Sequence, residues 1–290
     1  MKGSPFTHLC RQLTVLRPGR ADLHTHTTFS DGTHSPESLV ERAIRAGLKA
    51  VAVTDHDTIA GFGPARAAAG SAIEVIAGVE VTAEFRGAEI HLLGYFVRLD
   101  DGPLGTALQE LRASRRERLR EMARRLKPLG ADVEGDVAAL AEAVSAGRRH
   151  LARFLIDHGH ARSMHDAFTR WLAAPEIAGV GKRRLPADEA LARIRGAGGV
   201  ASWAHPPADL DLRALEELRE LGLRAVECVY PWPSRAQETR LRQLATAAGL
   251  AVTGGSDSHD PAPATRAVGA RTVTLDEVAR IRQLTPTPDP

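Results

Sequence analysis

Two histidines separated by one residue, in residues 22–26 (Asp-Leu-His-Thr-His), are well suited to metal chemistry. Side chains alternate between the two faces of an extended strand, so His24 and His26 are expected to point to the same side. Two imidazoles held side by side can bind one metal ion without distortion of the backbone. An isolated His-x-His motif is weak evidence for such a site, so the prediction depends on the rest of the chain.

Further imidazoles and carboxylates lie in or directly after other predicted strands. In barrels of parallel strands, catalytic groups gather at the C-terminal ends of the strands, so residues distant in sequence are expected to meet in one cleft. Imidazole and carboxylate ligands without a nearby thiolate suit Zn, Mn or Fe at a hydrolytic site better than a structural zinc site. Any one of these histidines alone is more often an ordinary polar residue than a ligand, so their joint placement carries the prediction. The residues are Asp55, His56, Asp57, Glu80, His91, His205, Asp257 and His259.

Composition limits the classes of protein that this sequence can encode. The chain has 290 residues, of which 43% are apolar, enough for the core of one large α/β domain with an insertion. Its net charge of +2 neither favours nor excludes a nucleic-acid partner. The two cysteines lie far apart and imply no disulfide framework. We find no stretch typical of a signal peptide or a membrane span, so we expect a cytoplasmic protein without membrane contact; no protein partner can be inferred.

Short apolar runs alternate with helical patterns from Ala21 onward, which predicts a mainly parallel sheet covered by helices. Ser35 as a helix N-cap, Pro36 at the first helical position and Gly47 at the end mark the first of these helices. Strands are predicted at 21–25, 50–54, 73–81, 89–96, 199–204, 225–229 and 251–254. Helices are predicted at 36–47, 58–69, 187–196, 212–221 and 234–248.

This alternation stops near residue 100, where a block of helical patterns without a convincing strand begins. A long arginine-rich helix is predicted at 104–129, and shorter helices at 136–145, 149–158 and 164–173. We interpret the block as an insertion into an α/β domain. The expected organisation is a flexible leader at 1–20, a barrel formed by 21–99 and 185–280, a helical insertion or cap at 100–184, and a flexible tail at 281–290.

Taken together, these motifs resemble the PHP (polymerase and histidinol phosphatase) superfamily over about residues 21–275. The resemblance implies a distorted (β/α)7 barrel that holds two or three divalent ions, such as Mn, Zn, Fe or Mg. Such ions lower the pKa of a bound water and clamp phosphate oxygens, so no serine or cysteine nucleophile is needed. The motifs are Asp-Leu-His-Thr-His (22–26), Ser-Asp-Gly (30–32), Thr-Asp-His-Asp (54–57), Gly-Val-Glu (78–80), Ala-His-Pro (204–206) and Gly-Ser-Asp-Ser-His (255–259).

The resemblance also implies how the ligands divide among the ions. Three groups result when the family's ligands are carried over motif by motif, and Glu80 bridges two of them. The groups are His24, His26, Glu80 and Asp257; Glu80, His91 and His205; and Asp31, His56 and His259.

Some polar residues near these motifs have roles that the sequence leaves open. PHP proteins carry His or an acid at the position of Asp31, and the acid is expected to change the occupancy or the metal preference of its group. Asp55 and Asp57 are candidates to orient His56 and other ligands from behind, although a turn role for Asp57 is equally consistent. Glu227 is either a site residue or a solvated strand end.

The helical insertion after His91 resembles a subgroup of the superfamily that comprises nucleoside 3′,5′-bisphosphate phosphatases and 5′–3′ exoribonucleases. In that subgroup a small helical domain contributes basic residues toward the substrate. Residues 147–153 (Gly-Arg-Arg-His-Leu-Ala-Arg) resemble its Arg-x-His-x-Ala-Arg segment. We therefore expect Arg148 and His150 to bind substrate phosphate.

Arg115, Arg116 and Lys182 are further candidates for phosphate binding, because guanidinium and ammonium groups suit phosphate oxygens. For most arginines of residues 112–125 a solvated helix face with paired glutamates is the simpler interpretation. The sequence also departs from the subgroup, since Pro-Ala-Asp (207–209) stands where Gly-Arg-Tyr is usual.

The expected function is a metal-dependent phosphatase or phosphoesterase. Its substrate would be a nucleotide, such as a 3′,5′-bisphosphate or an AMP-like monoester, or the 5′ end of a short RNA. Two alternatives stay open: a histidinol-phosphate phosphatase, which would not need a basic cap, and a non-catalytic, metal-stabilised PHP module. The complete ligand set argues against the last of these.

Overall fold

The structure is a computed structural model that describes residues 19–98, 102–140, 144–261 and 263–286. Residues 1–18 of the expected leader lie outside this part, and Arg20 already belongs to the first strand. Within the described residues, nine strands form one curved, nearly closed sheet in the order β8-β7-β6-β4-β3-β2-β1-β9, with β5 paired to β3. The strands are β1 (Arg20–Asp22), β2 (Ala50–Val53), β3 (Glu74–Phe85), β4 (Ala88–Tyr95), β5 (Leu185–Pro186), β6 (Val200–Trp203), β7 (Ala225–Val229), β8 (Ala251–Gly254) and β9 (Val273–Thr274).

The sheet curls until its two ends meet, which gives the expected distorted barrel. Beyond β1, the backbone N–H of Leu23 donates to the carbonyl of Gly254 at 3.1 Å. Thr25 then forms a parallel bridge with Ser258. The segments that follow β1 and β8 therefore lie side by side, and these segments carry the first and last of the six motifs.

Most neighbouring strands are parallel, as predicted, but β4 runs against both of its neighbours. The cause is local. Only Arg86 and Gly87 separate β3 from β4, and both have positive φ, 51° and 75°. A two-residue turn of this kind joins antiparallel strands in a hairpin. The hairpin carries Glu80 and His91 on adjacent strands.

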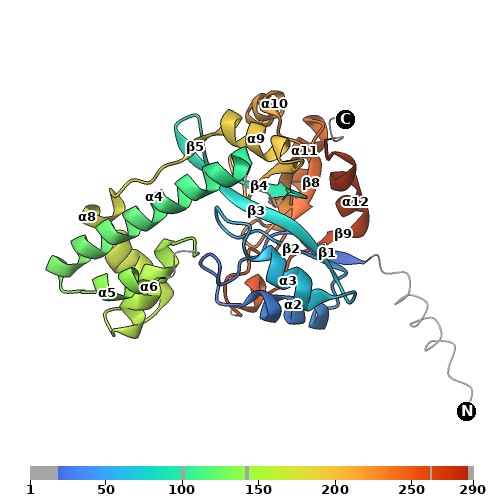
Figure 1. The fold of residues 1–290 in the computed structure, drawn as a ribbon. Helices are drawn as coiled ribbons and strands as arrows, with labels where there is room; N and C mark the ends of the chain where they lie inside the picture. Colours follow the sequence, from blue (N-terminus) through green and yellow to red (C-terminus); the bar gives the residue numbers. More distant parts are fainter. Residues whose placement is uncertain (1–18, 99–101, 141–143, 262, 287–290) are drawn as a thin grey trace, which may run out of the picture.

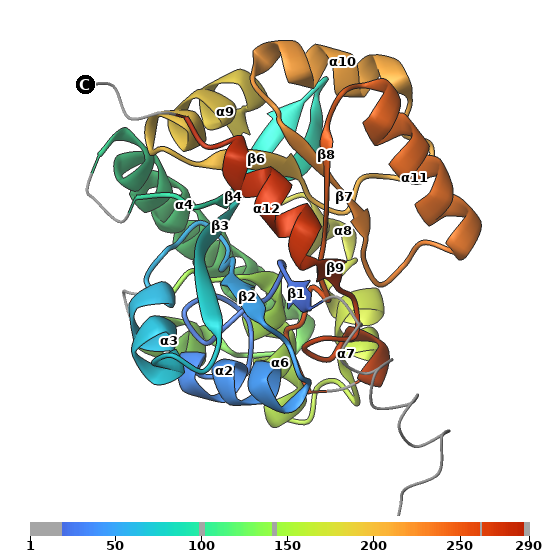
Figure 2. The ribbon, with the colours of Figure 1, turned by 90° about the vertical axis from the view of Figure 1, so that its right-hand side faces the viewer.

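Helices surround the barrel (Figure 2). Ser35 caps the first of them, because its side chain accepts a hydrogen bond from the N–H of Ser38. The last helix extends to Gln283, so the expected tail begins later than residue 281; residues 287–290 lie outside the described part. These helices are α2 (Pro36–Arg45), α3 (Phe62–Ala69), α9 (Ala187–Gly196), α10 (Leu212–Leu221), α11 (Arg235–Ala247) and α12 (Leu275–Gln283).

The block between β4 and β5 is helical, with α4 as its longest element. Figure 1 shows α4 reaching from the barrel to the shorter helices beside its far half. Leu104, Leu108 and Leu111 pack in the main barrel core, whereas Leu119 and Met122 belong to a separate core of the block. A single helix thus joins two cores; an independent insertion domain stays a prediction. The elements are α4 (Pro103–Leu126), α5 (Glu134–Ala139), α6 (Arg148–Asp157), α7 (Met164–Asp166), the π-helical turn Ala167–Leu172 and α8 (Pro175–Ala178).

No helix in the described part of the chain is long and apolar enough to cross a membrane.

Candidate metal centre

His24 and His26 lie in the chain just after β1, fully buried at the mouth of the barrel. Their ring centroids are 5.2 Å apart, so the two imidazoles lie side by side as the strand alternation predicts. Nδ1 of His24 lies 3.1 Å from Oε1 of Glu227, which leaves Nε2 directed at other groups. The other oxygen of Glu227 accepts a hydrogen bond from the N–H of His205 at 2.6 Å. Glu227, whose role the sequence left open, thus orients the imidazole of His24 and the chain just after β6.

Glu80 lies at the centre of the buried polar cluster. Its carboxylate is 1% exposed, and each oxygen faces a different set of imidazole nitrogens. Burial alone would raise the pKa of Glu80, but the surrounding imidazoles hold it well below its usual value. The contacts of Oε2 are His24 Nε2 at 3.3 Å, His26 Nε2 at 3.2 Å and His56 Nδ1 at 3.0 Å, and those of Oε1 are His91 Nδ1 at 2.8 Å and His205 Nε2 at 3.0 Å.

Asp257, just after β8, faces the same two histidines from the neighbouring segment of the barrel. Its Oδ1 lies 3.5 Å from Nε2 of His24 and 3.2 Å from Nε2 of His26. Burial would raise the pKa of Asp257, but His259 and the two histidines lower it far below its usual value. Residues 233 positions apart in sequence therefore share one site because β1 and β8 close the barrel.

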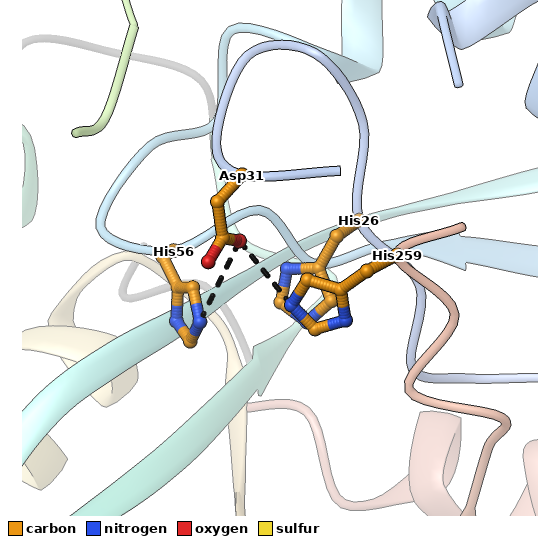
Figure 3. Close-up of side chains that lie close together, drawn as sticks. All are labelled: His26, Asp31, His56 and His259. Carbon is orange, nitrogen blue, oxygen red and sulfur yellow. Dashed lines mark ion pairs between the residues drawn. The ribbon is translucent and has the colours of Figure 1, made fainter. Parts of the chain in front are cut away.

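A second group surrounds Asp31 (Figure 3). Its Oδ1 lies 3.2 Å from Nε2 of His259 and 3.9 Å from Nε2 of His56. The rings of His26 and His259 stack with centroids 4.0 Å apart. The structure thus brings together the three residues that the sequence assigned to one group, and it adds His26 to them.

The donor atoms of this cluster fit divalent cations. Several buried imidazole nitrogens and carboxylate oxygens lack a hydrogen-bond partner among the described residues, although they lie within 4 Å of one another. Leaving such atoms unpartnered costs free energy unless a cation binds them. Burial opposes protonation of His26, yet Asp257 and Glu80 outweigh it and raise the pKa of that imidazole to about 9, so the site favours positive charge. Burial lowers the pKa of His56 to about 3 and keeps it in the neutral form that binds metal. The unpartnered atoms include Nε2 of His24 and His26, Nδ1 of His56, Oδ1 of Asp31 and Oε2 of Glu80.

The ligands group around several positions rather than one. Four sets of donor atoms lie close enough to share an ion: His26, Asp31, His56 and His259; His24, His26 and Asp257; His24, Glu80 and His205; and His56, Glu80 and His91. Glu80 belongs to two of these sets, which agrees with the bridging role that the resemblance implies. Every residue predicted as a ligand appears in at least one set.

Asp55 and Asp57 support the centre indirectly. Asp55 accepts from Thr27 and from the hydroxyl of Ser30 at 2.6 Å, so it fixes the loop that presents Asp31. Asp57 accepts from Thr82 and from Arg115. Neither carboxylate has a direct hydrogen bond to His56 among the described contacts, so their support acts through loops rather than on that imidazole.

Three residues of the centre adopt a left-handed backbone conformation that side chains other than glycine rarely occupy. Asp57, His205 and Asp257 have φ of 49°, 33° and 47°. Such conformations cost on the order of 1–3 kcal/mol each and cluster at functional sites. All three lie in loops that follow strands. The side chains of His205 and Asp257 reach the centre, whereas that of Asp57 bonds Thr82 and Arg115.

A cavity of about 210 Å³ adjoins the centre under the helical block. Metal-centre residues form one wall, and cationic side chains from the block and nearby loops form the other. We call it the cationic cavity. Its lining residues are Asp31, His56, Glu89, His91, Arg115, Arg118, Gly147, Arg148, Arg149, Phe168, Lys182, His259 and Arg266.

The predicted phosphate binders divide between this cavity and other places. Arg148 lines the cavity, with its guanidinium 5.7 Å from the centroid of Phe168. Lys182 also lines it, 2.9 Å from Glu89, and burial lowers its pKa to about 8. His150 is instead a helix cap, because its Nδ1 accepts from the N–H of Gly147 at 3.1 Å.

Two neighbouring arginines of α4 have structural partners. Arg115 reaches the cavity, but its Nε donates to Asp57 at 2.5 Å and its Nη2 to Thr82 at 2.7 Å. It therefore anchors α4 to the barrel. Arg116 does not line the cavity, and it donates to the carbonyl of Leu140 at 2.9 Å.

Sequence reasoning missed Arg118, which it assigned to a solvated helix face. Arg118 donates to the carbonyl of Val180 at 2.8 Å, and burial together with nearby Arg148 lowers its pKa to about 10. In the described part of the chain, neither Arg118 nor Arg148 has a carboxylate within ion-pair distance. Their charge is therefore available to an anion.

Arg149 and Arg266, which the sequence did not single out, are paired instead. Arg149 contacts Asp260, and Arg266 donates to Oδ2 of Asp257 at 2.7 Å. No spacing rule identifies them, since their partners lie far away in sequence or belong to an irregular loop.

Comparison with known proteins places this geometry in context. The PHP domain family matches residues 22–153. The chain is similar to the 5′-3′ exoribonuclease Rnm of Escherichia coli, with 34% identity over an alignment of 253 positions that covers 83% of this chain and 86% of the relative. It is also similar to the 3′,5′-nucleoside bisphosphate phosphatase of Chromobacterium violaceum, with 30% identity over 86% of this chain and 90% of that protein.

A solved structure from Bifidobacterium adolescentis, assigned as a metal-dependent phosphoesterase, has a similar fold. It superposes with a TM-score of 0.85 at 29% identity, covering 94% of this chain and 99% of the other. The likeness therefore extends over both the barrel and the helical block.

Proposed function

We propose that this chain, which belongs to the PHP family, hydrolyses a phosphate monoester of a nucleotide, either a nucleoside 3′,5′-bisphosphate or the 5′ end of a short RNA. One observation carries the proposal. A buried set of imidazoles and carboxylates centred on Glu80 directly borders a cavity with two arginines, Arg118 and Arg148, that have no carboxylate partner in the described part of the chain. A hydrolytic centre and an anion site thus share one space.

The centre would hold two or three divalent ions. As the resemblance implies, one ion would be held by His24, His26, Glu80 and Asp257, a second by Glu80, His91 and His205, and a third by Asp31, His56 and His259; the proximity of these side chains supports this division. This mixture of nitrogen and oxygen donors without sulfur suits Mn, Zn or Fe, and the carboxylates also admit Mg. Such ions, when bound, activate water and polarise the phosphate.

The protein's own side chains bind the substrate and hold the metal ligands in position. Arg118 and Arg148 bind a phosphate group of the substrate, since their charges have no internal carboxylate partner among the described residues, and Lys182 adds a third donor. Glu227 holds His24 and the backbone of His205, and Asp55 holds the loop of Asp31, so that the ligands keep their positions as charge develops on the phosphate.

The similarity to an exoribonuclease and to a bisphosphate phosphatase supports a substrate that carries a second phosphate. The same two arginines argue for it, because a centre that only hydrolyses a monoester needs no separate anion site beside its metal ligands. Histidinol phosphate, which has a single phosphate, would leave part of this site unused.

The test is phosphate release by metal-loaded protein from a nucleoside 3′,5′-bisphosphate, a short 5′-phosphorylated RNA and histidinol phosphate, with elemental analysis of bound metal. Glu80→Gln should lose metal and reduce turnover about a thousandfold, in line with the loss of preorganised charge in an active site. Glu74→Gln, at the start of the same strand and paired with Arg282 on the surface, is the matched control. Equal turnover of Glu80→Gln and wild type would refute the hydrolytic role, and a preference for histidinol phosphate would refute the nucleotide assignment.

A further inference from the structure

Trp232 presents an aromatic ring to solvent beside the candidate metal centre. It follows β7, lies between Pro231 and Pro233, and is 56% exposed. Single exposed apolar side chains are common on protein surfaces, so exposure alone carries nothing. Its position is informative, because its ring meets that of His205 edge to face with centroids 5.8 Å apart.

The ring is held in a fixed place relative to the centre. The guanidinium of Arg266 lies over it at 4.8 Å from the centroid, and the same guanidinium donates to Asp257. Tyr230 packs against its edge at 5.9 Å and donates its hydroxyl to the carbonyl of Pro206 at 2.6 Å. Trp232 is therefore in contact with His205 of the centre, and through Arg266 it is linked to Asp257.

A cavity of about 230 Å³ opens in front of this ring. Its walls include Trp232, His205 and the flat rings of Pro206 and Pro207. Arg266 lies between this cavity and the cationic cavity, since it lines the latter and its guanidinium lies over Trp232. A ligand with phosphate at one end and a flat ring at the other could thus span the two.

We propose that Trp232 is the platform on which the nucleobase next to the hydrolysed phosphate stacks. The proposal rests on the nucleotide-hydrolysing function proposed above and assigns the part of the substrate that the metal centre and arginines do not bind. Aromatic rings stack on any base, so Trp232 adds affinity without selecting a particular base.

A larger cavity of about 590 Å³ between β4 and β6 is the competing location. Its aromatic rings are less available. Trp203 is 5% exposed and Phe85 is half-buried, whereas Trp232 is 56% exposed. We therefore place the base on Trp232.

The experiment compares two substrates in each variant: a nucleoside 3′,5′-bisphosphate and the corresponding ribose bisphosphate without a base. Trp232→Ala should reduce the ratio of their kcat/KM values at least about tenfold, within the range for one base stacked on an aromatic ring. Trp232→Phe should retain most of the ratio, because it keeps an aromatic face. Leu221→Ala, which truncates an exposed apolar residue at the end of α10 that lines neither of these cavities, is the control and should leave the ratio as in wild type.

A second readout does not require turnover. Nucleotide titrated into metal-stripped protein should quench tryptophan fluorescence in wild type, and Trp232→Phe should remove most of that quenching. An unchanged ratio of kcat/KM values in Trp232→Ala would overturn the placement of the base on Trp232, and so would a loss of that ratio in Phe85→Ala instead. Phosphate release from nucleotides by the wild type would in that case still support the proposed function. Absence of both nucleotide hydrolysis and nucleotide binding in wild type would overturn the two together.

Discussion

The candidate metal centre takes its side chains from strand β3, the adjacent hairpin strand β4 and segments just after the ends of other barrel strands, whereas the cationic cavity takes most of its cations from α4, α6 and the loop before β5. In the centre, carboxylates such as Glu227 and Asp55 hold the ligands or their loops from behind. In the cavity, Arg118 donates to the backbone carbonyl of Val180 and has no carboxylate partner among the residues that the structure describes. The candidate metal ligands and the candidate anion-binding side chains are thus held by different parts of the fold.

Because the supports differ, we expect that metal binding at the centre and anion binding in the cationic cavity can be altered independently. Strand ends are fixed by the hydrogen-bonded sheet, so a change in the helical block should leave the centre intact. Contacts that join the block to the barrel beside the centre are exceptions: Arg115 pairs with Asp57, and Arg153 donates to the carbonyl of Asp31 at 3.1 Å. The predictions below test this separation, from the largest expected effect to the smallest.

Arg115→Ala should strongly destabilise the protein. It would leave the carboxylate of Asp57 buried without its partner, which typically costs about 3–5 kcal/mol. We expect urea unfolding to show a loss of this order, and Arg124→Ala, on the same helix but paired with Glu121 at the surface, to show little change. Similar stabilities of the two variants would mean that α4 is not anchored through Arg115.

Arg118→Ala should damage substrate selectivity more than basic hydrolysis. Loss of a charged contact to one phosphate should lower kcat/KM for a nucleoside bisphosphate by about 2 kcal/mol, roughly thirtyfold. Arg120→Ala, two positions along the same helix and exposed, should have no such effect. Rates that fall equally for a bisphosphate and a small monoester would remove Arg118 from the anion site and break the separation.

Lys182 should make substrate affinity depend on pH. Burial and the nearby Arg115 lower its pKa from 10.5 to about 8, so it is charged below pH 8 and neutral above. KM for the bisphosphate should therefore rise about tenfold as pH increases through this value, as expected for loss of one charged hydrogen bond worth about 1.5 kcal/mol.

The control for this prediction is Lys182→Arg, which stays charged and should flatten the profile. Because the folded protein binds the proton less tightly than the unfolded chain, Lys182 itself makes stability increase with pH between about 8 and 10.5. A change in affinity caused by unfolding would therefore have the opposite sign. An unchanged profile in Lys182→Arg would show that another group titrates.

His150→Ala should lower stability and leave selectivity unchanged. The side chain caps α6 by accepting from Gly147, and loss of a helix cap costs about 1 kcal/mol. We expect a small decrease in melting temperature that His150→Asn partly restores, since an amide can also accept a hydrogen bond. A changed ratio between bisphosphate and monoester rates would instead return His150 to the substrate site.

The sequence could predict the ligand set because two regularities act on it directly. Alternation along the extended segment after β1 places His24 beside His26, and the C-terminal ends of parallel strands meet at one mouth, which brings in Asp257. Glu80 was predicted to end its strand, but β3 continues to Phe85, so Glu80 reaches the centre from within the strand. Helix α12 was not among the predicted helices, although the sequence at its start contains a helix-capping pattern. Thr274 and Glu277 form a capping box at its start, a pattern visible in the sequence.

The sequence by itself determined the alternation of strands and helices and the residue types of the metal centre, since these depend on neighbouring residues and on a repeating topology. Only the tertiary structure decided among Arg115, Arg116 and Arg118. Successive residues of a helix point about 100° apart, so these three reach Asp57, Leu140 and the cationic cavity respectively. Which of these arginines faces the cationic cavity depends on what α4 packs against, and the neighbours of α4 come from remote parts of the chain.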